Sequence, residues 1–109
     1  MEVSMHEESG AVVLVPTDDV DLSTARDLQH ALREALDRAG GGGRLIVDLA
    51  GVPYMDSSGV ATLVEAMQIA RKKDTALVLC GLQPKVRSIF EIARLDRVFT
   101  IVETRADAA

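Results

Sequence analysis

The feature of the sequence that most restricts its fold is the alternation of short apolar runs with longer segments of helical periodicity. Short apolar runs are typical of buried strands, and apolar residues spaced by three and four positions are typical of amphipathic helices. Strands that alternate with helices favour parallel pairing with right-handed crossover connections. The sequence therefore predicts an α/β fold with a mixed, mostly parallel sheet of four to five strands and about three main helices.

The expected elements follow one another in the order β-β-α-β-α-β-α-β. The first two strands form a hairpin, because the polar residues between them end in Gly10, which readily adopts a positive φ. The expected strands cover residues 2–6, 11–15, 45–49, 76–80 and 98–102, and the expected helices cover residues 22–39, about 57–73 and about 84–94. Pro16 is expected to end the second strand, Asp21 or Ser23 to cap the first helix, and the polar tail at 103–109 to fray.

The composition is that of one ordinary globular domain. The chain has 109 residues, 48% hydrophobic and 27% charged, which is enough for a core without a metal or disulfide. Seventeen acidic against twelve basic residues give a net charge of −5, and the basic stripe expected of a nucleic-acid binder is missing. No secretory signal is expected, because the first residues lack a basic region followed by an apolar run, and no apolar run reaches the ~18–20 residues of a membrane span. The single cysteine, Cys80, fits a reducing compartment. We therefore expect a cytoplasmic protein, with no direct nucleic-acid binding and no membrane insertion.

Three loops are expected to meet at one edge of the sheet, because the carboxyl ends of parallel strands lie together. They are an acidic loop at 18–21, a loop at 50–58 and a short turn at 81–83. The second loop ends in Asp56-Ser57-Ser58, three residues that all favour a helix N-cap and exceed what one helix start requires. We expect the acidic loop and the two serines to be neighbours, and one serine to act as a switch.

This edge lacks the groups that a hydrolytic serine needs. His6 and His30 fall away from it in the expected layout, so neither can serve as a base. Residues 55–59 do not form the Gly-x-Ser-x-Gly elbow, and no cysteine–histidine cluster could hold zinc. The acidic residues could hold Mg²⁺, but acidic loops at helix starts are common for capping alone, and we favour capping. We expect no catalytic residue and no metal site, and hence no enzymatic activity.

A serine at a helix N-terminus is also a suitable place for phosphate, because the free N–H groups and the helix dipole favour an anion there. Phosphorylation would add about −1.5 to −2 charges beside Asp56 and the acidic loop. Such a change would alter the surface rather than the fold, as expected for switching off a docking face. From the residues alone, plain capping and phosphorylation both remain open at Ser57 and Ser58.

Residues 48–60, Asp-Leu-Ala-Gly-Val-Pro-Tyr-Met-Asp-Ser-Ser-Gly-Val, resemble the signature of STAS domains of the anti-anti-sigma factor type, the anti-sigma factor antagonists. Residues 20–25 resemble the segment that opens the first helix of that family, and residues 81–86 and 90–96 resemble its third-helix region. The resemblance thus covers nearly the whole chain and implies a single STAS domain over residues 1–109. One departure is Asp18, where the family usually has glycine.

The resemblance implies partner switching without a cofactor. In such families the unphosphorylated protein binds an anti-sigma factor that is also a serine kinase, and this binding releases a sigma factor. The kinase phosphorylates the first serine of the motif, which is Ser57 here rather than Ser58, and a serine phosphatase reverses the step. The family's acidic residue near the phosphorylated serine falls on Asp21. Other STAS proteins serve non-sigma partner-switching pathways or are accessory subunits of ABC-type lipid transporters, and many of the latter lack the serine.

We expect the docking surface to combine the start of the second helix with the acidic loop. Its expected residues are Asp21, Leu22, Asp56, Ser57, Ser58, Gly59, Val60 and Leu63. Ser58 is expected to cap the helix beside the phosphorylated residue, and Met67, further along the helix, is expected in the core.

Overall fold

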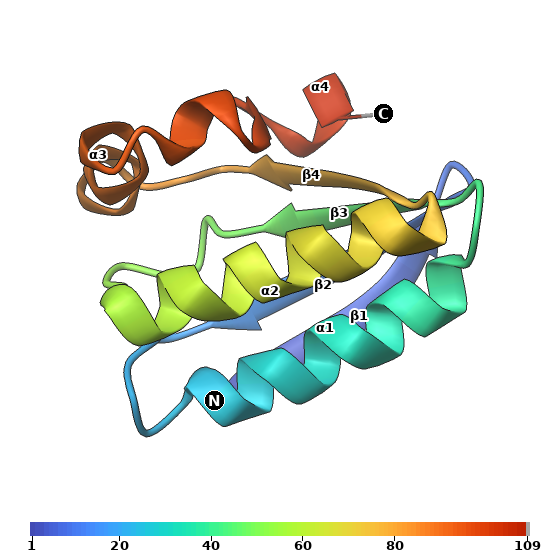
Figure 1. Ribbon diagram of the computed structural model, residues 1–109. Helices are drawn as coiled ribbons and strands as arrows, with labels where there is room; N and C mark the ends of the chain where they lie inside the picture. The colour runs from blue at the N-terminus through green and yellow to red at the C-terminus, as the bar shows by residue number, and fades with distance from the viewer. Residues whose placement is uncertain (109) are drawn as a thin grey trace.

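The computed structural model describes residues 1–108, which form one sheet with helices on both of its faces (Figure 1). The strands are β1 (Glu2–Glu8), β2 (Ala11–Thr17), β3 (Arg44–Asp48), β4 (Ala76–Cys80) and β5 (Thr100–Val102). The helices are α1 (Ala25–Ala39), α2 (Ser57–Lys73), α3 (Pro84–Ile92) and α4 (Arg105–Ala108), with a 3₁₀ helix η1 (Leu95–Arg97) before β5. The predicted α/β class and the predicted order of strands and main helices are confirmed, and α4 follows them.

The strand order in the sheet is β1-β2-β3-β4-β5, with β1 antiparallel to β2 and all other neighbours parallel. The hairpin turn consists of Ser9 and Gly10, whose φ values are 51° and 81°. Two consecutive positive φ angles match the right-handed twist of the flanking strands. The helices α1, α2 and α3 each connect two parallel neighbours and pack on the same face of the sheet, as right-handed crossovers between successive strands require.

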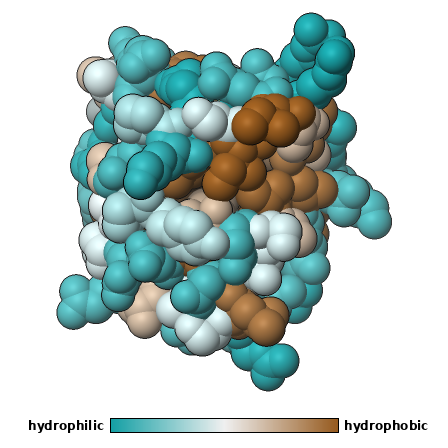
Figure 2. Space-filling view, turned by 90° about the vertical axis from the view of Figure 1, so that its left-hand side faces the viewer, coloured by the Kyte–Doolittle hydropathy of each residue, from teal (hydrophilic) through white to brown (hydrophobic). Residues whose placement is uncertain are grey.

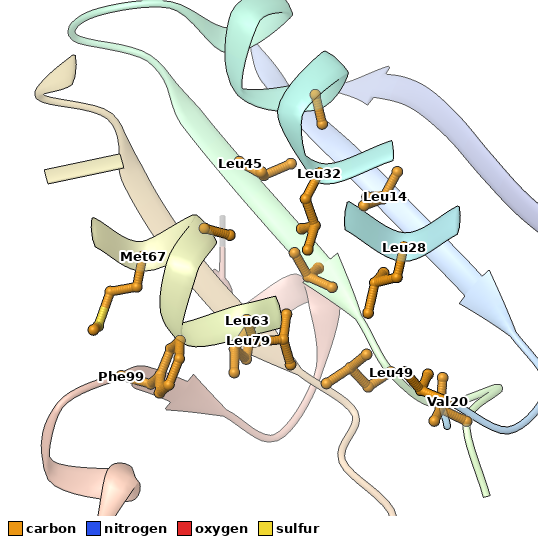
Figure 3. Packing of buried hydrophobic residues seen from close by; sticks show 14 of the residues in the cluster. Leu14, Val20, Leu28, Leu32, Leu45, Leu49, Leu63, Met67, Leu79 and Phe99 are labelled. Atoms are coloured by element: carbon orange, nitrogen blue, oxygen red, sulfur yellow. The ribbon is translucent and has the colours of Figure 1, made fainter. Parts of the chain in front are cut away.

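Apolar side chains cover both faces of the sheet, because alternate residues of a strand point to opposite sides. The larger cluster lies under α1, α2 and α3 and includes Leu14, Leu28, Leu32, Leu45, Leu63, Leu79 and Phe99 (Figure 3). The smaller cluster, on the opposite face under α4, consists of Ala11, Val13, Ile46, Cys80 and Ala108. Burial raises the pKa of the Cys80 thiol to about 11, so this residue packs as a small hydrophobe and is not a reactive thiol.

Four of the five strands differ from their predicted bounds: β1 and β2 each end two residues later, β3 lies one residue earlier and β5 begins two residues later. β2 continues through Pro16 to Thr17, because the pairing of β2 with β3 ends at Leu14 and Pro16 faces a neighbouring strand on one side only. Proline is tolerated at such an edge position. β5 begins at Thr100 and not at Val98, because the N–H groups of Val98 and Phe99 bond back to Leu95 O at the end of η1.

The helices α3 and α4 differ from expectation as well. α3 ends at Ile92 and not near residue 94, because Arg94 adopts a left-handed φ of 60° that ends the helix. Residues 105–108, expected to fray, form α4, in which Ala108 is buried against the sheet. Among the helices described, none has the length and hydropathy of a segment that could cross a membrane.

Candidate functional site

The acidic loop (residues 18–21) and the loop before α2 (residues 49–56) run side by side at the carboxyl end of the sheet. Three backbone hydrogen bonds join them: Asp18 N–H to Gly51 O at 2.9 Å, Val20 N–H to Tyr54 O at 2.9 Å and Asp56 N–H to Val20 O at 3.1 Å. These bonds extend the parallel pairing beyond the end of β2 and β3 as an isolated bridge. The prediction that the acidic loop and the two serines are neighbours is confirmed.

Asp56 is the N-cap of α2. Its backbone is extended, and its carboxylate accepts the N–H of Ser58 at 2.8 Å, which satisfies one of the free donors at the helix start. The expectation that Ser58 caps the helix is wrong, because Ser58 already has helical geometry and its backbone is the group that is capped. Ser57 is the first helical residue and is exposed. Its hydroxyl makes no hydrogen bond within residues 1–108.

Gly59 allows the acidic loop to pack directly against α2. A Cβ at this position would lie 2.6 Å from Met55 Cγ and 2.7 Å from Val20 Cγ1, closer than real side chains approach one another. Met55 and Val20 are buried, so they have little room to yield. The glycine that follows the two serines therefore sets the distance between the helix and the acidic loop, and with it the position of Ser57.

Asp21 stabilises the turn that precedes α1. Its carboxylate accepts the hydroxyl of Ser23 at 2.6 Å and the N–H groups of Ser23 and Thr24 at 2.9 and 3.2 Å. These hydrogen bonds, that of the Ser23 hydroxyl foremost, lower the pKa of Asp21. Because the side chain takes these N–H groups, residues 22–24 form a turn and α1 starts at Ala25 instead of Leu22.

Two exposed apolar side chains adjoin these carboxylates along the chain, since Leu22 directly follows Asp21 and Tyr54 lies two residues before Asp56. The large hydrophobic residues with the highest exposure are Leu22 (82%), Tyr54 (50%), Ile92 (84%) and Val98 (40%). Figure 2 looks onto the end of the molecule where α2 begins and shows hydrophobic side chains gathered on a largely hydrophilic face. Exposed apolar patches of this kind mark interaction surfaces. Sequence reasoning missed Tyr54 and Ile92. Ile92 could have been found, because it falls outside the apolar stripe of its helix at 86, 89, 90 and 93.

The predicted docking residues divide into exposed and buried ones. Leu22 and Ser57 are exposed, and Asp21, Asp56, Ser58 and Val60 are half-buried. Leu63 is 0% exposed and belongs to the core, so its inclusion in a docking surface is wrong. Gly59 is also buried, and because residues four apart share a helix face, Leu63 points inward with it. Met67 is buried as predicted.

The two histidines lie away from the serines. His6 contacts Glu8 within β1 at 2.5 Å, and His30 is exposed on α1. Neither forms a hydrogen bond or ion pair with Ser57 or Ser58. Within residues 1–108, no three His, Cys, Asp or Glu side chains are grouped so that they could hold a metal ion.

Asp18 occupies a backbone conformation that favours glycine, since its φ is 94°, and it stands where the family resemblance leads us to expect glycine. Asp18→Gly is expected to raise the free energy of unfolding by about 0.5–1 kcal/mol, because relief of about 1–2 kcal/mol of strain exceeds the added chain entropy of glycine. Urea denaturation measures the change. The control is Asp19→Gly, an exposed neighbour without a positive φ, which is expected to lose about 0.5–1 kcal/mol. Equal destabilisation by both variants would contradict the prediction.

The sequence and the fold can now be compared with known proteins. The model of the STAS domain family matches residues 2–108. The anti-sigma-B factor antagonist of Listeria monocytogenes is 33% identical over 91 residues, which cover 78% of this chain and 80% of that protein.

Solved structures show the same fold. An anti-sigma factor antagonist from Mycobacterium paratuberculosis matches with a TM-score of 0.87 at 21% identity, over 98% of this chain and 89% of that one. SpoIIAA, solved in an unphosphorylated form and, from Bacillus, in a phosphorylated form, matches with a TM-score of 0.70 in each, at 16% and 18% identity. These matches cover 97% and 98% of this chain and 92% and 96% of those chains. The chain belongs to the STAS domain family, in the group of anti-sigma factor antagonists, which are non-enzymatic regulators.

Proposed function

We propose that this protein acts by phosphorylation-controlled partner switching in the cytoplasm. In its unphosphorylated form it binds an anti-sigma factor that is also a serine kinase, and so releases a sigma factor. The kinase then phosphorylates Ser57 and the complex separates, until a serine phosphatase removes the phosphate. The observation that carries the proposal is the exposed Ser57 hydroxyl, which has no hydrogen-bond partner within residues 1–108 and stands beside the acidic loop.

The contrast between the two serines favours Ser57 as the phosphate acceptor. Ser57 is exposed, whereas Ser58 is half-buried with its N–H bonded to Asp56. A phosphate on Ser57 would gain from the helix dipole but would add about −1.5 to −2 charges next to existing carboxylates. The known relatives support the same reading, since SpoIIAA has been solved in both phosphorylated and unphosphorylated forms.

The docking surface that we propose is centred on Leu22. This side chain is 82% exposed, and the turn held by Asp21 presents it. The half-buried Asp56, Ser58 and Val60 and the exposed Ser57 form the adjoining start of α2. An exposed apolar anchor bordered by carboxylates fits a partner with an apolar pocket and basic residues around it.

Phosphorylation of the intact protein by its cognate anti-sigma kinase tests the proposal. With ATP present, mass spectrometry is expected to place one phosphate on Ser57, to find none on the Ser57→Ala variant and to find it retained on Ser58→Ala. Phosphate on the Ser57→Ala variant, or none on the parent, would contradict the proposal. Binding of a transporter ATPase that is indifferent to Ser57→Ala would favour an accessory subunit of an ABC-type lipid transporter instead.

A further inference from the structure

Arg105, the first residue of α4, connects the C-terminal helix to β3. This strand leads into the loop before α2 (residues 49–56), which is called the Ser57 loop below because it ends just before Ser57. Its Nε and Nη2 donate to Asp48 Oδ2 at 3.1 and 2.9 Å, and its Nη1 donates to Glu8 Oε2 at 2.6 Å. One guanidinium thus bridges two carboxylates that lie on different strands, β1 and β3. Planar, multidentate contacts of this kind fix geometry as well as charge.

Both oxygens of the Asp48 carboxylate accept hydrogen bonds. While Oδ2 takes the two Arg105 bonds, Oδ1 accepts the N–H of Ala50 at 3.0 Å. The side chain is only 14% exposed, and a Cβ on Gly81 would lie 2.8 Å from Oδ1, so the glycine leaves the space that the carboxylate fills. Without its arginine, this carboxylate would be largely buried and unpaired, which favours its movement toward water.

Ala50 lies near the start of the Ser57 loop, two residues after the end of β3. The Ala50 carbonyl accepts a hydrogen bond from Gln83 Nε2 at 2.8 Å. The carbonyl of the next residue, Gly51, accepts a hydrogen bond from the N–H of Asp18 at 2.9 Å. A continuous set of contacts therefore runs from α4 through Asp48 and Ala50 to the acidic loop. Loss of the hydrogen bond between the Ala50 N–H and Asp48 Oδ1 would loosen the loop at the end opposite Asp56.

We propose that Arg105 is a positioning residue for the Ser57 loop, which it orders by holding the Asp48 carboxylate against the Ala50 N–H. This inference rests on the proposed function only for the role of Ser57. When α4 is detached, a smaller fraction of molecules presents the loop in its binding-competent arrangement, and the apparent affinity of a partner falls by that fraction. The short C-terminal helix thereby controls a surface with which its own described side chains form no hydrogen bond or ion pair.

Hydrogen exchange in the free, full-length protein tests the loop contact directly. Arg105→Met retains most of the stem and removes the guanidinium, and it is expected to speed exchange of the Ala50 amide by about tenfold. The Gly42 amide, bonded to Asp74 O at 2.8 Å, is expected to keep its rate. The control variant is Arg87→Met, which removes the 3.5 Å ion pair with Glu103 and is expected to leave Ala50 unchanged. An unchanged Ala50 rate in Arg105→Met, or equal acceleration at Gly42, would overturn the proposal.

A double variant tests whether Arg105 orders the loop through the charge of Asp48 or only through its own packing. In Arg105→Met combined with Asp48→Asn, the amide oxygen can still accept the Ala50 N–H and needs no cation, so exchange at Ala50 is expected to return to within about threefold of the parent. Equal acceleration in the single and double variants would show that Arg105 does not act through the Asp48 charge.

The kinetics of Ser57 phosphorylation by the cognate kinase test the functional consequence. For Arg105→Met, the KM for phosphorylation of Ser57 is expected to rise about tenfold with kcat retained. Faster exchange at Ala50 with an unchanged KM would overturn the role of Arg105 in presenting Ser57. Absence of phosphate on the parent protein would reject the proposed function, while the exchange experiment would still decide the loop contact.

Discussion

Replacing Phe90 with alanine is expected to lower the free energy of unfolding by about 3–5 kcal/mol. The ring is 0% exposed and meets Phe99 edge to face, with centroids 5.5 Å apart at an interplanar angle of 75°. The variant loses both the transfer free energy of the ring and its contact with Phe99, and it leaves a cavity between α3 and the sheet. Because a domain of this size is stable by only about 5–15 kcal/mol, the loss is a large part of the total.

Urea denaturation at neutral pH measures this loss, and Ile92→Ala is the matched control. Ile92 lies in the same helix, two residues further on, but is 84% exposed. Its truncation is expected to change the free energy of unfolding by less than about 0.5 kcal/mol. Similar losses from both variants would show that α3 does not pack as described.

Ser57→Asp is expected to weaken binding of the anti-sigma partner by about 100-fold, or about 2.8 kcal/mol. The variant places a carboxylate beside Asp56 in a surface that the proposed complex covers, and an unpaired charge in an interface is costly. Stability is expected to stay the same or to rise slightly, because Ser57 is exposed at the first position of α2, where the helix dipole favours an anion. Loss of binding without loss of stability separates a switch from a structural defect.

Isothermal titration calorimetry with the purified partner measures the affinity, and Ser57→Asn serves as the neutral control of similar size. Ser57→Asn is expected to bind within about fivefold of the parent, since it adds no charge. If asparagine weakens binding as much as aspartate does, the effect is steric and the electrostatic explanation is wrong.

The sheet and its three main helices could be predicted because they depend on local periodicity. The continuous apolar run of β2 and the helical spacing of apolar residues in α1 are properties of neighbouring residues. The meeting of the acidic loop with the loop before α2 followed from the rule for parallel strands. Gly59 was predicted as part of the motif, and the structure adds the physical reason, its close approach to Val20 and Met55.

Other features depend on contacts that the sequence does not display. The start of α1 is set by hydrogen bonds of the Asp21 side chain, and the expected cap, Asp21 or Ser23, is wrong because the N-cap position is occupied by Thr24. α4 forms at a segment without apolar periodicity, and Arg105 reaches Glu8 and Asp48, which lie 97 and 57 positions away in the sequence. The burial of Leu63 was missed because an exposed helix start was extrapolated one turn too far.

The close packing of Gly59 against the acidic loop has a consequence for recognition. Ser57 is displayed on a three-dimensional epitope whose two halves, residues 18–21 and 54–58, come from distant parts of the sequence. A kinase that acts on Ser57 would therefore read a folded substrate, and a synthetic peptide of the serine motif would carry only half of the epitope. Under the proposed function, nascent or denatured chains would be poor substrates, so the signal would report only on correctly folded molecules.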